Sequence, residues 1–249
     1  MSTQSISTIF NQKLFRIPDY QRGYSWGVEQ LEDFWIDLDN LSGTRNHYTG
    51  VLTLQKANTA TLPQQWNQYQ FLIQYNNFIP CYVVDGQQRL TTIIILLQQI
   101  INAIPNGGGI LGNTKTELTT KYIKREYANI DNVNQESYIF GYEVDDPSDK
   151  YLKAELFGDT KISFSDDEMS VYTRNLEFAI KFFNKKLKGI TMEKLGELFH
   201  KLTSRLQFTV YEMENGLDTH MIFETTNNRG KSLSKFNTMD SFRQLFCLF

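Results

Sequence analysis

A short polar block near the middle of the chain combines the groups that bind phosphate. It consists of Asp85, Gly86, Gln87, Gln88 and Arg89, and it separates a short apolar strand from a long apolar helix. The first turn of such a helix offers free main-chain N–H groups and the positive end of the helix dipole, and a guanidinium can fork onto phosphate oxygens. The block therefore predicts an anion site at the start of the helix.

Each side chain of this block has an expected role at the anion site. Gly86 lets the main chain approach a ligand closely, and Asp85 accepts a proton or holds a magnesium ion. We expect Gln87 and Gln88 to orient a water or a ribose. Further hydroxyls near the same helix end belong to Thr91 and Thr92. The structural alternative is a capping box, because Asp85 and Gln88 have its three-residue spacing.

An aromatic and basic segment lies near the N-terminus. Its close spacing of tyrosine, tryptophan and arginine suits stacking on a base together with contact to phosphate. The alternative is an aromatic loop that packs under the following helix. The segment contains Tyr20, Gln21, Arg22, Tyr24 and Trp26.

A third polar segment, residues 228–232, resembles the end of a P-loop. No glycine stands at the required upstream position, and the segment follows an expected helix rather than a strand. We interpret it as a helix end that carries the cations of Arg229 and Lys231, with a solvated turn as the alternative. The histidines show neither metalloprotease spacing nor a serine or cysteine partner motif; they are His47, His200 and His220.

Composition restricts the partners and the compartment. The 249 residues carry a formal net charge of −3, so any contact with DNA requires a local patch or a partner domain. Cys81 and Cys247 show no paired spacing, which argues against a disulfide framework or a zinc site and fits a reducing cytosol. No signal pattern and no apolar run of membrane-spanning length is present. We expect a cytoplasmic protein without a membrane partner.

Apolar spacing predicts the elements that position these segments. The helix after Gly86 is apolar around nearly its whole circumference, so we expect it to be central and buried. Residues 1–16 read as a lead-in, 145–148 as a loop, and 55–77 as a long hairpin or an insertion. Helices are expected over residues 28–41, 87–104, 115–127, 165–188, 191–203, 217–227 and 234–249. Strands are expected over 48–54, 80–84 and 206–213, which together give an α+β fold.

Taken together, the polar segments resemble one family, the N-terminal domain of GmrSD-type restriction proteins, which carries a DGQQR motif. The matching blocks keep the family's order and separation, and residues 85–90 form the most specific of them. The blocks are residues 17–26, 48–50, 85–90, and Phe223 with 228–234. The chain departs from the pattern at Asn237, where many relatives have an aspartate, and we expect no nuclease domain with His-Asn-His chemistry within these 249 residues.

The resemblance implies a fold similar to ParB and sulfiredoxin, in which a small mixed sheet with helices is followed by a mostly helical part. The nucleotide-binding core would occupy residues 1–110, and a mostly helical insertion would follow over 111–205. Residues 206–249 would complete the core, ahead of the missing nuclease domain.

The resemblance also implies nucleoside triphosphate binding and hydrolysis with Mg²⁺, in a system that regulates cleavage of modified phage DNA. It places Asp85, Gln87, Gln88 and Arg89 at the nucleotide, with Arg22 nearby. The segment with Asn228, Arg229 and Lys231 would help to close the site.

Two other functions remain open from the sequence. The chain could be a nucleotide- or DNA-binding module without hydrolysis, or a DNA-nicking nuclease of the ParB type. The nuclease is the weaker alternative, because the sequence offers no metal-ligand cluster beyond Asp85. The sequence also leaves oligomerisation open.

Overall fold

A mixed six-stranded sheet organises the part of the chain that the computed structural model describes, which is residues 2–61, 66, 69–128, 134–143 and 146–213. Its strand order is β1 (Ser2–Ser5), β10 (Leu206–Met213), β3 (His47–Lys56), β4 (Ile79–Asp85), β2 (Lys13–Ile17) and β9 (Phe140–Tyr142). The pairs β10–β3, β4–β2 and β2–β9 are parallel, and β1–β10 and β3–β4 are antiparallel. The first and last described strands therefore lie side by side.

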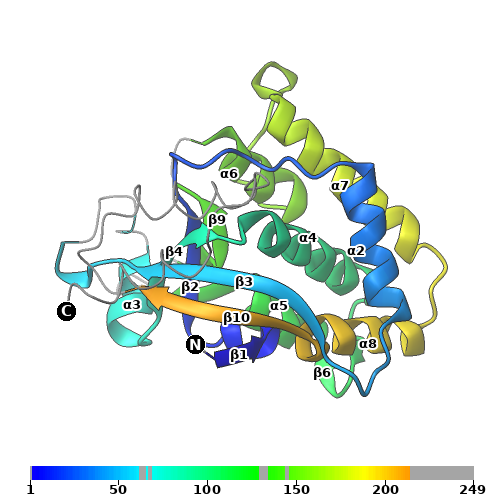
Figure 1. Cartoon of the computed structure of the whole chain (residues 1–249). Coiled ribbons are helices and arrows are strands. Elements are labelled where there is room, and N and C mark those ends of the chain that lie inside the picture. Colours follow the sequence, from blue (N-terminus) through cyan, green and yellow to red (C-terminus); the bar gives the residue numbers. More distant parts are fainter. Residues whose placement is uncertain (1, 62–65, 67–68, 129–133, 144–145, 214–249) are drawn as a thin grey trace, which may run out of the picture. The chain divides into compact units, whose positions relative to one another are not determined.

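Helix α4 (Gln87–Ala103) is the centre of the hydrophobic core. Its residues from Leu90 to Ile101 are all buried, including the run of isoleucines and leucines 93–97. It packs against α7 (Val171–Leu187), α5 (Lys115–Tyr122) and α8 (Met192–His200), as Figure 1 shows. β-Branched isoleucines are poor helix formers in isolation, so packing rather than intrinsic propensity stabilises this helix.

Helix α2 (Val28–Asn40) follows the aromatic segment and is amphipathic. It buries Leu31, Phe34, Trp35 and Leu38 at three- and four-residue steps. The rings of Phe34 and Trp35 each lie 6.3 Å from the ring of Phe183 on α7. This packing holds α2 beside α7, which in turn covers α4.

The expected α+β class is confirmed by the mixed sheet and its helices. The strands expected over 48–54, 80–84 and 206–213 correspond to β3, β4 and β10, and the central buried helix is α4. The remaining described elements are α1 (Ile6–Ile9), α3 (Gln70–Tyr75), α6 (Pro147–Tyr151), β5 (Gly109–Ile110), β6 (Asn113–Thr114), β7 (Lys124–Ala128) and β8 (Asn134–Tyr138). Short turns of helix occupy Thr59–Thr61, Leu152–Leu156, Asp166–Glu168 and Lys201–Arg205.

The start of the helix expected over 165–188 was wrong. Glu168 does form a capping box with Ser165, but the turn that it starts, Asp166–Glu168, is a single 3-10 turn. A second box, between Ser170 and Thr173, starts α7 at Val171. The first capping box therefore starts only a short turn, and the long helix α7 begins at the second.

Local patterns also missed several short elements. The expected lead-in 1–16 contains β1, α1 and most of β2, and the expected helix 115–127 ends at Tyr122 before β7. Asp146 caps α6 where a loop was expected. The helices expected over 217–227 and 234–249 lie outside the described residues. Among the described helices, none combines the length and the apolarity needed to cross a bilayer.

We predict that Ile95→Ala lowers the free energy of unfolding by about 2–5 kcal/mol, because it leaves a cavity that the packed core cannot close. Ile95 is fully buried, whereas Ile36 on α2 is 50% exposed. Ile36→Ala is the matched control, and we expect it to change stability by less than about 0.5 kcal/mol. Chemical denaturation measures both, and equal losses would contradict the central place of α4.

Candidate active site

The turn between β4 and α4 is built on Gly86. This residue has a φ of +89° and is the N-cap of the helix. Its N–H donates to Asp85 Oδ1 at 2.8 Å. A Cβ at this position would lie 3.0 Å from the carbonyl oxygen of Val51 and 3.1 Å from a methyl of Leu52. Glycine therefore permits both the left-handed turn and the close approach of β3.

The capping box between Asp85 and Gln88 does not form. Gln88 Oε1 instead accepts the N–H of Ser25 at 2.8 Å, and Gln88 Nε2 donates to the carbonyl of Gly23 at 3.1 Å. No side chain caps α4, and the main-chain N–H groups of residues 87–89 have no acceptor among the described residues. The first turn of a buried helix therefore keeps donors that can bind an anion.

Three glutamines fix residues 21–26, which we call the 21–26 loop, against the start of α4. Gln87 Nε2 donates to the carbonyl of Arg22 at 3.1 Å. Gln21 Nε2 donates to the carbonyls of Val83 and Val84 at 2.7 and 2.9 Å. Together with Gln88, they tie the loop to β4 and α4. The side-chain amides of Gln87 and Gln88 thus contact main chain, and their expected roles toward a water or a ribose stay predictions.

The two threonines of the motif region lie inside the fold. Thr91 and Thr92 are buried, and Thr92 Oγ1 donates to the carbonyl of Gln88 at 2.9 Å. The hydroxyl of Tyr24 lies 2.8 Å from Thr92 Oγ1, and a side-chain hydrogen bond joins Thr91 to Tyr142. Burial raises the pKa of Tyr24 well above its usual range, so the phenol stays a neutral donor. The contact between Tyr24 and Thr92 therefore joins the 21–26 loop to α4.

Arg89 is held by strand β3. Its Nη1 donates to the carbonyl of Thr49 at 2.6 Å, and it forms no ion pair with any described residue. Gly50 has a φ of +126°, and a Cβ there would lie 1.7 Å from Nη1. The glycine in the middle of β3 therefore makes room for the guanidinium, whose remaining N–H groups are free of described partners.

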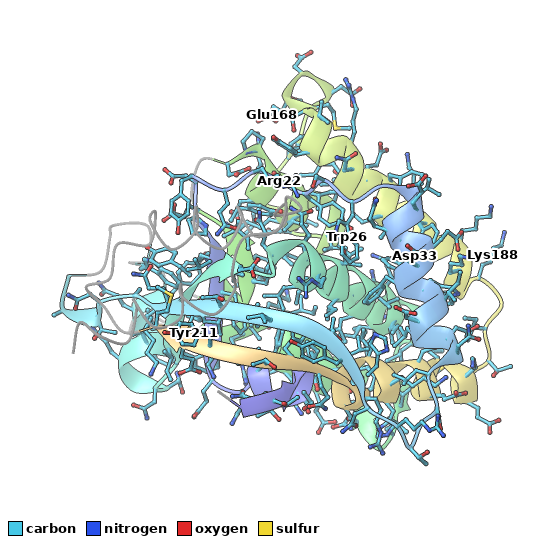
Figure 2. The ribbon with its side chains drawn as sticks, in the orientation of Figure 1. Arg22, Trp26, Asp33, Glu168, Lys188 and Tyr211 are labelled. Atoms are coloured by element: carbon cyan, nitrogen blue, oxygen red, sulfur yellow. The ribbon has the colours of Figure 1, made fainter. Side chains whose placement is uncertain are left out.

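Arg89 also lines a pocket of about 230 Å³ between α2, β3 and α4, which we call the Trp26 pocket. Trp26 stands at the start of α2 and Asp33 farther along it, and both face the space beside α4 (Figure 2). Phe34 and Leu206 give the pocket apolar walls, and Asp37 lies 3.7 Å from His47. The complete lining is Trp26, Gln30, Asp33, Phe34, Asp37, His47, Thr49, Arg89 and Leu206.

A second pocket, of about 500 Å³, is lined in part by the beginning of the 21–26 loop. Its lining comes from residues 19–23, the start of α6 at 146–148, Ser170 and Tyr172. Arg22 is exposed here (Figure 2). Burial, reinforced by Glu143 and Asp19, raises the pKa of Tyr20 to about 12, so this phenol is neutral at physiological pH.

The structure brings most of the sequence-predicted site residues into one region. Asp85–Arg89 and the 21–26 loop are neighbours, whereas Asn228, Arg229 and Lys231 lie outside the described residues. No group of three or more metal-ligand side chains occurs among the described residues. Sequence reasoning missed Asp33 and Thr49 as pocket residues. Gly50 was the available signal, because a glycine inside a strand often marks close approach of another group.

The chain matches the model of a known protein family. The family described as the GmrSD restriction endonuclease N-terminal domain matches residues 6–243 of this chain. No curated protein matches the sequence.

We predict that Gly50→Ala lowers the free energy of unfolding by about 1–3 kcal/mol, because residue 50 has a φ of +126°, which an alanine adopts only with strain, and because the new methyl displaces the guanidinium of Arg89. Gly43→Ala is the matched control, since a Cβ there meets nothing within 4 Å. Thermal unfolding of both variants measures the difference. A Gly50→Ala variant as stable as the unaltered chain would mean that residue 50 does not need the positive φ at which it approaches Arg89.

Proposed function

The chain belongs to the family of GmrSD restriction endonuclease N-terminal domains, and we propose that it binds and hydrolyses nucleoside triphosphates to regulate a modification-dependent restriction system. The family itself gives a restriction, and hence phage-defence, context. The nucleotide and its hydrolysis are our proposal.

This proposal rests mainly on one observation. The main-chain N–H groups at the start of α4 have no hydrogen-bond acceptor in the part of the chain that the structure describes, although the neighbouring glutamine side chains are hydrogen-bonded. The N–H groups of residues 87–89 have no described acceptor, while the side chains of Gln87 and Gln88 are fixed on the 21–26 loop. Such an end attracts phosphate through its amides and its dipole. The exposed Arg22 on the adjoining loop adds a positive charge that can approach the same phosphates.

Asp85 is the carboxylate that fits a magnesium ion carried by the nucleotide. Its Oδ1 accepts the N–H of Gly86, and its side chain is partly exposed at the end of β4. Mg²⁺ commonly uses only one or two protein carboxylates when phosphate oxygens and waters complete its shell. A single aspartate is therefore sufficient here. The ion, when bound, neutralises charge on the phosphates.

In the proposed reaction, a water oxygen bonds to the γ-phosphorus and the bond from that phosphorus to the β–γ bridging oxygen breaks. The products are a nucleoside diphosphate and inorganic phosphate, and the water loses a proton. Asp85, the described carboxylate nearest in sequence to the free amides, either holds the ion or accepts that proton directly or through water. Gln21, Gln87 and Gln88 are positioning residues that hold the loop and the helix start in register.

We propose that DNA contact uses a local patch or a partner domain. The outward face of α7 offers such a patch: Arg174, Lys181 and Lys185 are exposed on it at seven- and four-residue steps, and Lys181 also forms an ion pair with Glu177 one turn before it. Phosphate contacts of this kind make binding strongly dependent on salt.

We predict that Asp85→Asn lowers phosphate release from a triphosphate with Mg²⁺ by about 10²–10⁴-fold, because the amide cannot accept a proton. Release is measured with the full chain, and Asp166→Asn, at an exposed turn far along the sequence, is the matched control. Equal release by the unaltered chain and Asp85→Asn would contradict the assignment. Binding without any release by the unaltered chain would instead select a nucleotide-binding module.

We also predict that the double change of Lys181 and Lys185 to glutamine weakens DNA binding and reduces the salt slope by about 2, because each lysine neutralises one DNA phosphate. A pair of exposed lysines elsewhere, Lys121 and Lys161, is the control. An unchanged slope in the α7 variant would place DNA contact elsewhere.

A further inference from the structure

We propose that the Trp26 pocket binds the base of the nucleotide and selects guanine. This inference rests on the proposed function, because it names the base that the same site prefers.

The size and the position of the pocket suit a single base. Its volume of about 230 Å³ is below the roughly 300–1,000 Å³ of pockets that enclose drug-sized ligands, so it fits one ring system rather than a whole nucleotide. Arg89 connects it to the motif, because this residue lines the pocket and also belongs to the first turn of α4. A nucleotide with its phosphates at the helix start can therefore place its base here.

The walls of the pocket suit stacking. Trp26 lines the pocket and is partly exposed, and its ring lies 6.1 Å from that of the buried Phe34. Base–aromatic stacking needs one open ring face held in place by packing on another side. Stacking alone tolerates every base, so the choice of base depends on the polar groups.

The polar groups of the pocket include hydrogen-bond acceptors on α2 and a hydrogen-bond donor on α4. Helix α2 presents Asp33 and Asp37 one turn apart, and these carboxylates can only accept hydrogen bonds. Asp37 lies near His47, whereas Asp33 has no described partner. The guanidinium of Arg89 on α4 can only donate hydrogen bonds, and one of its N–H groups already donates to the carbonyl of Thr49.

Guanine matches both kinds of group with paired contacts. Its N1–H and N2–H are adjacent donors for the two oxygens of one carboxylate, and its O6 and N7 are adjacent acceptors for a guanidinium fork. Adenine has a single exocyclic donor group beside an acceptor nitrogen, and uracil has a single ring N–H. Asp33 and Arg89 together therefore favour guanine.

The test is calorimetric binding of the full chain to the β,γ-imido analogues of GTP, ITP, ATP and UTP with Mg²⁺. We expect the GTP analogue to bind about 5-fold to 100-fold more tightly than the ATP analogue, which corresponds to one paired base contact. The ITP analogue, which lacks the N2 amine, should fall between them. Asp33→Asn should remove most of the preference for GTP over ITP and leave ATP binding nearly unchanged.

Two further variants separate stacking from base selection. Trp26→Ala should weaken all four analogues by a similar factor, on the order of 10-fold, because stacking does not distinguish bases. Glu29→Gln is the matched control, because Glu29 is an exposed acid on the same helix outside the pocket lining. It should bind all four analogues like the unaltered chain.

The outcomes distinguish this inference from the function on which it rests. Equal affinity for all four analogues, or an Asp33→Asn effect that is the same for each, would overturn guanine selection and leave nucleotide binding intact. Binding of none of them would overturn the proposed function and the base pocket together.

Discussion

The fixation of a loop by side-chain amides is the interaction on which the site depends. Gln21, Gln87 and Gln88 donate to main-chain carbonyls of the loop and of β4, and Gln88 also accepts from Ser25. These bonds pair the side-chain N–H groups with main-chain carbonyls, whereas Oε1 of Gln21 and Oε1 of Gln87 are buried without a partner among the described residues. They also commit the motif's side chains to structure, so the helix start must offer its main chain to a ligand. The three glutamines therefore shape the site through contacts within the chain, independently of any ligand.

Two glycines allow neighbouring segments and side chains to come into close contact around this loop. Gly86 admits β3 to the helix start, and Gly50 admits the guanidinium of Arg89 to β3. The buried hydroxyls of Tyr24 in the loop and Thr92 on α4 lie 2.8 Å apart and join the loop to the helix. Because α4 is buried on all sides from Leu90 to Ile101, its first turn is held firmly relative to the sheet. A ligand at this place would meet donors that are already oriented, which lowers the cost of binding.

The sequence predicted the central features of the fold and less of the detail. The apolar circumference of α4 and the strand patterns of β3, β4 and β10 are strong local signals, and they identified the elements beside the motif. The short N-terminal strands escaped prediction because pairing partners distant in sequence stabilise them: β1 pairs with β10, and β2 pairs with β4 and β9. Asp85 and Gln88 show the limit of spacing rules. Their separation suits a capping box, yet Gln88 binds a loop more than sixty residues earlier in the chain. Asp33 lies in one pocket with Arg89 because α2 packs against α7, which covers α4, and no local pattern encodes that packing.

The most direct measurement is the response of the main-chain amides at the start of α4. The ¹⁵N–¹H resonances of Gln87, Gln88 and Arg89 are followed while a non-hydrolysable triphosphate with Mg²⁺ is added. We expect these three resonances to shift more than any others, because their N–H groups acquire phosphate acceptors. Saturable binding that leaves these amides unmoved and shifts resonances elsewhere would contradict it.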